Sequence, residues 1–157
     1  MLENYQAKYP TPFAVLGIRT VGERLTDIEY LPPGVATLAP LTSLAEKICR
    51  QIGRYLDDPE FRFSLPFEFI GTPFQCKVWQ VICKIQSGRT LTYIDIARKF
   101  ATAPRPVGGA CGANRIPIVI PCHRVVGRNG LGGFMKARDG FPLDIKRWLL
   151  QHEDAEL

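Results

Sequence analysis

The chain has few histidines, and its cysteines do not have the spacing of a metal site. Its 157 residues include two histidines and five cysteines, at positions 49, 76, 83, 111 and 122, with no CxxC pair. A structural zinc site needs four closely placed sulfur or nitrogen ligands, so we predict no bound metal. An odd cysteine count without a secretion signal also argues against a disulfide framework.

Other absences narrow the class of protein. No apolar run approaches the roughly 18 residues of a membrane-spanning helix, and the start "MLENYQAKYP" lacks the basic-then-apolar layout of a secretion signal. No glycine-rich loop follows a strand in a βαβ unit, which argues against a nucleotide or methyl-donor site. We therefore predict a cytoplasmic protein with no membrane partner and no cofactor.

The composition is globular, and the charge is unevenly distributed. Hydrophobic residues make up 46% and charged residues 22% of a chain whose length fits one domain or two small lobes. Residues 1–70 hold 7 Lys and Arg against 9 Asp and Glu, a balance of −2, whereas residues 71–157 hold 13 against 6, a balance of +7. The basic half predicts a polyanionic partner, although a solubilising surface would have the same charge.

Residues 1–70 have the pattern of a small α/β lobe. In "FAVLGIRTVGERLTDIEYLPP" apolar residues alternate on both sides of Gly22, which predicts a hairpin. "APLTSLAEKICRQIGRYLDD" has an apolar helical face, and "RFSLPFEF" resembles an edge strand because Pro66 interrupts it. No residue of this lobe looks catalytic.

Residues 71–157 predict a second, mainly helical lobe. A helix capped by Thr72 runs toward Gly88, with Cys76 and Cys83 both expected to face the core. "YIDIARKF" predicts a short helix after Thr92, and a second short helix follows from about residue 105 to 113. Two short helices separated by a brief break outline a helix-turn-helix.

The second of these helices is almost without side chains. Gly108, Gly109 and Gly112 lie within it, although each glycine costs about 1 kcal/mol of helix propensity. Tight helix packing, or a loop in place of the helix, would explain them. Alternatively, the backbone lies close against DNA and Arg105 is the one long side chain at its start. A helix without base-reading side chains suits the minor groove better than the major groove.

The segment "NRIPIVIPCHRVVG" holds the candidate reactive group. Pro117 and Pro121 favour a fixed turn that presents the thiol of Cys122, and we expect the other four cysteines to be small buried side chains. The Asn114 amide can pair with backbone groups that the prolines leave unpaired. His123 could activate the thiol as a base, although adjacent side chains usually diverge and the pair could arise by chance.

A carboxylate holding the imidazole would complete a relay. Spacing leaves five carboxylates open for this role: Asp139, Asp144, Glu153, Asp154 and Glu156.

Five motifs over residues 71–153 carry a specific resemblance. "GTPFQCKVW", "TYIDIA", "RPVGGACGAN", "IPCHRVVGRNG" and "KRWLLQHE" occur in this order, and together they resemble the O6-alkylguanine-DNA alkyltransferases, or methylated-DNA–protein-cysteine methyltransferases. The resemblance implies an α+β fold: a ribonuclease-H-like α/β lobe at 1–70, and a DNA-binding and alkyl-acceptor domain at 71–157 with a helix-turn-helix and an active-site turn.

The resemblance also assigns roles to the residues that carry chemistry. It implies that Cys122 accepts the alkyl group, that His123 acts as base through a water molecule, and that Glu153 orients the imidazole. Asn114 would brace the active-site turn. Tyr93 would press on the phosphate beside the target nucleotide and help to protonate the departing guanine.

Further positions would contact DNA and substrate. By resemblance, Arg105 fills the gap left by a base that has rotated out of the duplex, and Gly108 and Gly109 lie in the minor groove. The carbonyls of Cys122 and Val125, the Phe134 ring and the Met135 amide would contact the guanine. This chain departs from the family pattern in having Phe134 where many members have tyrosine, and a longer segment at 136–144.

The implied function is direct-reversal DNA repair. A single-turnover transferase would move the alkyl group from O6-alkylguanine in double-stranded DNA to Cys122 and, as a monomer, act once per molecule. Whether O4-alkylthymine is also a substrate stays open. The alternatives are a non-catalytic sensor of alkylated guanine with the same fold, a thiol hydrolase, and a DNA-binding regulator without chemistry.

Overall fold

The chain has a mixed α/β fold made of two compact units, Met1–Glu68 and Phe69–Leu157, as predicted at the level of fold class. The computed structural model describes residues 4–132 and 141–155. None of the helices within these described residues is both long enough and apolar enough to cross a membrane.

The first unit contains an antiparallel sheet with strand order β1-β2-β3. The strands are β1 (Ala7–Pro10), β2 (Val15–Val21) and β3 (Arg24–Leu31). The predicted hairpin is confirmed, because β2 pairs with β3 around a turn in which Gly22 has φ +58°. The β1 strand was not predicted from the sequence.

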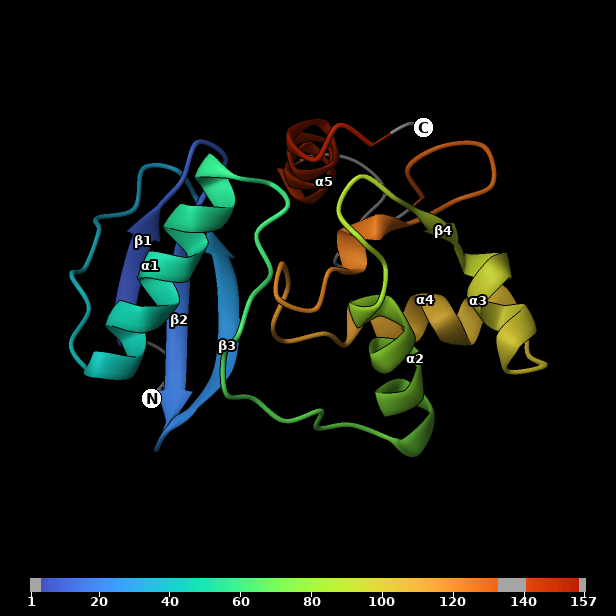
Figure 1. Ribbon diagram of the computed structural model, residues 1–157, viewed down its shortest axis with the longest axis horizontal. Helices are drawn as coiled ribbons and strands as arrows, with labels where there is room; N and C mark the ends of the chain where they lie inside the picture. Colours follow the sequence, from blue (N-terminus) through green and yellow to red (C-terminus); the bar gives the residue numbers. More distant parts are fainter. Residues whose placement is uncertain (1–3, 133–140, 156–157) are drawn as a thin grey trace. The chain divides into compact units, whose positions relative to one another are not determined.

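A single amphipathic helix, α1 (Ser43–Asp57), packs on β1 and β2 of this sheet (Figure 1). Thr42 caps it by accepting a hydrogen bond from the Ala45 N–H. Its buried face includes Ile48, Ile52 and Cys49, as the apolar spacing predicted. The core of the first unit therefore lies between one helix and one sheet.

The prediction of a strand at "RFSLPFEF" was wrong. Residues 62–69 belong to no strand or helix. They are tied to β3 by a backbone hydrogen bond from the Leu25 N–H to the Pro66 carbonyl. Because Pro66 has no N–H, it cannot return a ladder bond, which explains why pairing does not continue.

The second unit begins with α2 (Pro73–Cys83), which has a capping box between Thr72 and Gln75. The helix ends at Cys83 and does not continue to Gly88. Its last turn is of the 3₁₀ type, because the Lys84 N–H donates to the carbonyl of Val81, three residues earlier. The expected burial of Cys83 was also wrong: this side chain is exposed, and Cys76 is half-buried.

The predicted pair of short helices is present as α3 (Tyr93–Lys99) and α4 (Pro104–Gly112). Thr92 and Asp95 form a capping box at the start of α3. The helices α2 and α4 pack together (Figure 1), and the indole of Trp79 donates a hydrogen bond of 2.8 Å to the Ala110 carbonyl. The second helix therefore forms despite its glycines.

Four further elements lie in the described part of this unit. A short 3₁₀ helix, η1 (Cys122–Arg124), leads into β5 (Val125–Val126), which pairs in parallel with β4 (Leu91–Thr92). The last helix, α5 (Phe141–His152), packs against η1, and its buried residues include Leu149 and Leu150. The β4–β5 pairing brings the start of α3 beside the segment that carries Cys122.

Candidate active site

The candidate nucleophile Cys122 lies at the start of η1, on a tightly constrained turn. Its side chain is 4% exposed, and its N–H donates to the Ile120 carbonyl at 2.8 Å. Ile118, four residues earlier, has φ +74°, a conformation that β-branched residues rarely adopt. Strain of this kind persists only where the surrounding structure enforces it, and it clusters at functional sites.

Asn114 enforces the shape of this turn. Its amide oxygen accepts from the Ile116 N–H at 2.9 Å, and its amide nitrogen donates to the Ile120 carbonyl at 2.9 Å. The same nitrogen lies 3.2 Å from the sulfur of Cys122. The Asn114 amide therefore bonds to both ends of the segment 116–120 and contacts the thiol. This position agrees with the bracing role that the resemblance implied.

His123 and Glu153 form a buried pair. The Nε2 of His123 lies 2.8 Å from Oε2 of Glu153, with both side chains almost completely buried. Of the other carboxylates considered from the sequence, Asp144 pairs with a surface arginine and Asp154 is exposed. Asp139 and Glu156 lie outside the described residues. Among the described candidates, Glu153 is the partner of the imidazole.

Arg124 holds the far side of the same carboxylate. Its Nε donates to Oε1 of Glu153 at 2.9 Å and its Nη2 to Oε2 at 3.0 Å, while its Nη1 donates to the Ile85 carbonyl at 2.6 Å. A guanidinium that donates two hydrogen bonds to one carboxylate forms a strong, charge-assisted pair with it. The sequence interpretation did not assign Arg124 a role.

The charges of Glu153 and His123 follow from these contacts. Burial alone would raise the pKa of Glu153, but His123 and Arg124 together hold it well below its usual range, so Glu153 is ionised. Burial lowers the pKa of His123, so the imidazole is neutral at neutral pH. Because an ionised carboxylate can only accept, we assign the proton to Nε2 of His123 and the basic lone pair to Nδ1. This Nδ1 atom is buried without a hydrogen-bond partner among the described residues.

Cys122 has a second thiol beside it. The neighbouring Cys111 thiol, together with burial, raises the pKa of Cys122 well above its usual value. The Cys122 thiol in turn lowers the pKa of Cys111, which is half-buried on α4. A thiol in the state of Cys122 needs a base before it can attack.

Lys146 of α5 is a buried cation in this site. It is 0% exposed, and its Nζ donates to the Val125 carbonyl at 2.7 Å and lies 5.8 Å from the centre of the Tyr93 ring. Burial lowers the pKa of Lys146 to about 8, and a thiolate at Cys111 or Cys122 opposes that shift. The sequence interpretation missed this residue, although it falls in helical register with the apolar residues Leu143 and Leu149.

Tyr93 occupies the first position of α3 and is half-buried. Its ring lies against Gly132, where an added Cβ would come within 2.8 Å of the ring. The parallel pairing of β4 with β5 places Thr92 opposite Val126, so Tyr93 emerges next to the active-site segment. Phe134 and Met135, the other expected substrate contacts, lie outside the described residues.

The glycine face of α4 is open. Arg105 is exposed at the start of the helix, and a Cβ added at Gly108 or Gly109 would meet no atom of the described chain within 4 Å. Tight packing therefore does not explain these two glycines, and the helix itself excludes the loop interpretation. Because these two positions carry no side chains, the exposed surface of α4 that follows Arg105 is smooth.

Comparison with known proteins matches this arrangement. The DNA-binding domain of 6-O-methylguanine DNA methyltransferase matches residues 73–155. The inducible methylated-DNA–protein-cysteine methyltransferase of Bacillus subtilis is 43% identical over 66% of this chain and 56% of its own length. The enzyme of that name from Haemophilus influenzae is 35% identical over 95% of this chain and 86% of its own.

A solved structure, Mycobacterium tuberculosis OGT in complex with DNA, superposes with a TM-score of 0.77 at 30% identity, covering 94% of this chain and 91% of that one. The match spans 56% of the length of the Bacillus protein, and 58% and 63% of the lengths of relatives from Acanthamoeba polyphaga mimivirus and Methanocaldococcus jannaschii. The chain therefore spans less than two thirds of the length of these three curated relatives. The family match and the Haemophilus relative nevertheless cover enough of the sequence to decide its family. The chain belongs to the family of 6-O-methylguanine DNA methyltransferases, the methylated-DNA–protein-cysteine methyltransferases.

Proposed function

We propose that this protein repairs DNA by direct reversal, transferring the alkyl group of O6-alkylguanine to the sulfur of Cys122. The observation that carries this proposal is the buried contact of 2.8 Å between His123 and Glu153, next in the chain to a thiol that the Asn114 amide contacts. Membership of the family, whose relatives are named for this reaction, supports the same conclusion.

The chemistry begins with a proton transfer. Nδ1 of neutral His123 takes the proton of Cys122 through a bridging water molecule, and ionised Glu153 stabilises the imidazolium that results. The Cys122 thiolate then attacks the alkyl carbon bound to O6. A sulfur–carbon bond forms while the carbon–oxygen bond breaks, and the departing guanine takes up a proton, for which Tyr93 is the proposed donor.

Two groups near Cys122 would stabilise its thiolate against burial and the neighbouring Cys111, which raise the pKa of the thiol. Lys146 supplies a buried positive charge near both thiols, and the Asn114 amide donates toward the sulfur. In a site of low dielectric, fixed donors and charges of this kind contribute more than they would in water. We therefore add Lys146 to the proposed positioning residues, together with Arg124, which fixes the ionised state of Glu153.

The guanine would be held by backbone groups of the same segment. The Val125 carbonyl already accepts from Lys146, and the Cys122 carbonyl accepts from the Val125 N–H. Each carbonyl oxygen keeps a second lone pair, which could accept from the exocyclic amino group of guanine. The Phe134 ring and the Met135 amide stay proposed contacts.

We propose that α4 docks in the minor groove of double-stranded DNA. The exposed Arg105, the smooth surface at Gly108 and Gly109, and the balance of +7 in residues 71–157 support this proposal. The target nucleotide would rotate out of the duplex, and Arg105 would enter the space that it leaves. Tyr93 would contact the neighbouring phosphate.

Several finer statements belong with this proposal. We propose a ribonuclease-H-like character for residues 1–70, a DNA-binding and alkyl-acceptor role for residues 71–157, and action as a cytoplasmic monomer. O4-alkylthymine, which also carries an alkyl group on a ring oxygen, is a second candidate substrate. The sensor alternative is disfavoured because Cys122 is a nucleophile with a base beside it.

The test is a titration with DNA that contains O6-methylguanine in excess over protein. A thioether is a poor leaving group, and within residues 4–132 and 141–155 no group near Cys122 is suited to removing the alkyl group. We therefore expect repaired guanine to stop at one equivalent per protein molecule. Continued turnover would contradict the proposal, and so would the absence of any repaired guanine.

We predict that Arg105→Ala lowers repair of duplex DNA by at least about tenfold while changing the reaction with free O6-benzylguanine by less than about twofold, because only the duplex leaves a gap to fill. Arg98→Ala removes the same charge from an exposed position on α3 and serves as control. Comparing the two rate constants for each variant checks the prediction. Equal losses on both substrates would contradict the proposed role.

The glycines of α4 allow a prediction in which stability and function move in opposite directions. The double variant Gly108→Ala and Gly109→Ala should raise the free energy of unfolding by about 0.5–1 kcal/mol per site, because alanine favours the helix. The added methyl groups should weaken DNA binding by about tenfold, because they would keep the helix backbone from approaching the groove closely. Urea denaturation and fluorescence anisotropy measure the two effects. Gly34→Ala, at another open position, is the control; unchanged DNA affinity of the double variant would contradict the docking face.

A further inference from the structure

The proposed docking helix α4 has few features of its own that would keep it helical. It is nine residues long and contains three glycines, and Ala103, the residue before it, makes no side-chain cap. Glycine is a poor helix former, and a helix this short is marginal in water without tertiary contacts. The buried residues of α4 are Val107 and Ala110. Contacts with other elements must therefore keep α4 folded.

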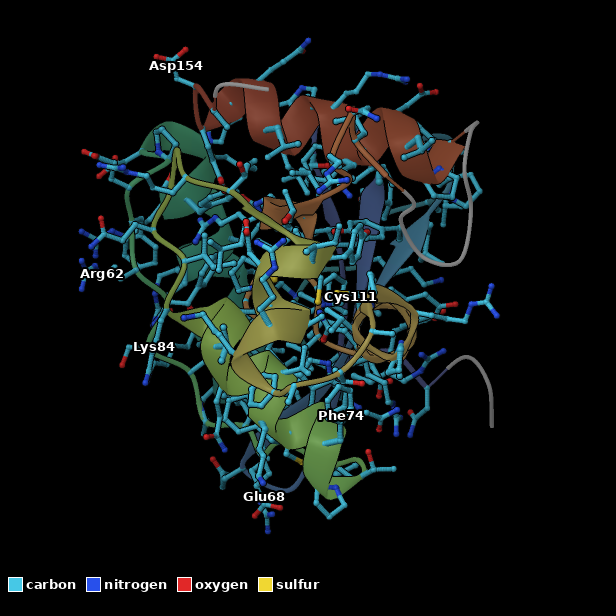
Figure 2. The ribbon with its side chains drawn as sticks, turned by 90° about the vertical axis from the view of Figure 1, so that its right-hand side faces the viewer. Arg62, Glu68, Phe74, Lys84, Cys111 and Asp154 are labelled. Carbon is cyan, nitrogen blue, oxygen red and sulfur yellow. The ribbon has the colours of Figure 1, made fainter. Side chains whose placement is uncertain are left out.

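Trp79 of α2 makes such a contact with the end of α4. Its side chain is buried, and its indole N–H donates to the Ala110 carbonyl at 2.8 Å. Ala110 carries one of the last four carbonyls of the helix, which are the ones that need partners beyond the regular helical bonds. Figure 2, which views α4 nearly along its axis, shows Cys111, the next residue, turned toward the interior of the second unit. The indole therefore bonds to α4 from its buried side.

The other end of the indole ring lies against Gly71. A Cβ added at Gly71 would come within 2.7 Å of Cη2 and 2.9 Å of Cζ3 of Trp79. Real Cβ atoms do not approach carbon atoms so closely, so the ring occupies the space that a side chain at position 71 would need. The ring is thus held between the Gly71 backbone and the Ala110 carbonyl, and its N–H points at α4.

The active-site turn has support of its own. Asn114 bonds through its side chain to the Ile116 N–H and to the Ile120 carbonyl, both at 2.9 Å, and contacts the sulfur of Cys122. None of these three contacts involves Trp79. Loss of the indole hydrogen bond should therefore change the order of α4 more than the geometry at Cys122.

We propose that Trp79 is a positioning residue for DNA docking, and that its indole N–H keeps the glycine-rich helix α4 formed before DNA is bound. The glycines leave the outer surface of α4 smooth, and the indole supplies from the inside the support that their absent side chains cannot give. A helix that is already ordered binds more tightly, because the cost of ordering it does not fall on the binding step. The consequence for DNA rests on the proposed function, whereas the effect on α4 does not.

Hydrogen exchange of the native full-length protein tests the effect on α4. Trp79→Phe keeps a buried aromatic ring but removes the N–H donor, so the backbone amides of α4 should exchange about fivefold faster or more. The amides of α5, in the same unit, should change by less than about twofold. Trp148→Phe makes the same chemical change at the chain's other tryptophan and should leave α4 as in the wild type. Unchanged exchange of α4 in Trp79→Phe, or equal acceleration in α4 and α5, would overturn the proposal.

Two functional measurements on the same variant separate positioning from a general loss of structure. Trp79→Phe should weaken binding to duplex DNA containing O6-methylguanine by about fivefold or more, while the rate with free O6-benzylguanine changes by less than about twofold. Equal losses in both measurements would show that Trp79 supports the whole unit and does not position the docking helix.

The double variant Gly108→Ala and Gly109→Ala tells the two possible failures apart. If it weakens DNA binding while Trp79→Phe does not, α4 is the docking helix but the role of Trp79 is wrong. If neither variant weakens DNA binding, although α4 exchanges faster in Trp79→Phe, the proposed docking face itself is wrong.

Gly71→Ala acts on the indole from its other end and leaves Trp79 in the chain. The added methyl group would displace the ring, so we expect the same combination of faster exchange in α4 and weaker binding to DNA. This variant provides the test if Trp79→Phe does not fold. A folded Gly71→Ala protein with wild-type exchange in α4 and wild-type DNA affinity would contradict the proposal.

Discussion

Replacing Cys122 with serine is expected to lower alkyl transfer by at least about 10³-fold, because a hydroxyl is a far weaker nucleophile than a thiol and is scarcely ionised by a neutral imidazole. The buried pair of His123 and Glu153 stays intact in this variant, since it does not involve the sulfur. The rate of repair of O6-methylguanine in duplex DNA measures the effect. Binding to the same DNA should change by less than about twofold, because the proposed docking face on α4 is untouched.

The control for this experiment is another cysteine. Cys49→Ser alters a buried thiol of the first unit and should leave repair at the wild-type rate per folded molecule. If Cys122→Ser still repairs DNA within about tenfold of the wild type, a different residue accepts the alkyl group. If instead Cys122→Ser folds normally but loses DNA binding, the thiol contributes to recognition in a way that the proposed mechanism does not contain.

Glu153→Ala is the second variant with a large expected effect. Removing this carboxylate leaves the Arg124 guanidinium in a largely buried position without its partner, and it releases the imidazole of His123. Breaking a buried ion pair from one side costs about 3–5 kcal/mol, so we expect the free energy of unfolding to fall by that amount. Urea denaturation followed by circular dichroism measures it.

A matched exposed pair provides the comparison. Glu46 pairs with Arg50 at 3.4 Å on the surface of α1, with both side chains 64% exposed. Glu46→Ala should cost no more than about 0.5 kcal/mol, because water screens such a pair. Equal costs for the two substitutions would show that burial of the Glu153 carboxylate does not matter to stability.

Glu153→Gln separates stability from chemistry. The amide can still accept a hydrogen bond from Nε2 of His123, but it cannot stabilise an imidazolium by charge. The repair rate should therefore fall by about 10²-fold or more even where the variant is folded. Unaltered repair by folded Glu153→Gln would contradict the proposed relay.

Local signals in the sequence predicted the parts of the fold that local chemistry controls. Gly22 marked the hairpin turn, Thr92 marked the start of α3, and the spacing of apolar residues marked α1. The same reasoning failed for residues 62–69 and for the end of α2. Pro66 has no N–H to continue the pairing of residues 62–69, and α2 ends early because the Lys84 N–H donates to the Val81 carbonyl. The apolar pattern of the sequence does not report these backbone hydrogen bonds.

The candidate site was only partly visible in the sequence for a related reason. Cys122 and His123 are adjacent in the chain, so the sequence alone shows that they lie close together. Arg124 and Lys146 act through partners on other elements, which only the fold brings together. A lysine within the apolar face of α5 was the signal that could have identified Lys146 before the structure.

Alkyl transfer to a single sulfur atom is the central step of the proposed function, and locating the transferred group tests it most directly. Protein exposed to duplex DNA containing O6-methylguanine is digested with trypsin, and the peptides are measured by mass spectrometry. We expect the peptide of residues 116–124 alone to gain the mass of one methyl group in place of a hydrogen, with the added group on Cys122. A methyl group on any other residue, or an unmodified protein alongside repaired DNA, would contradict the account.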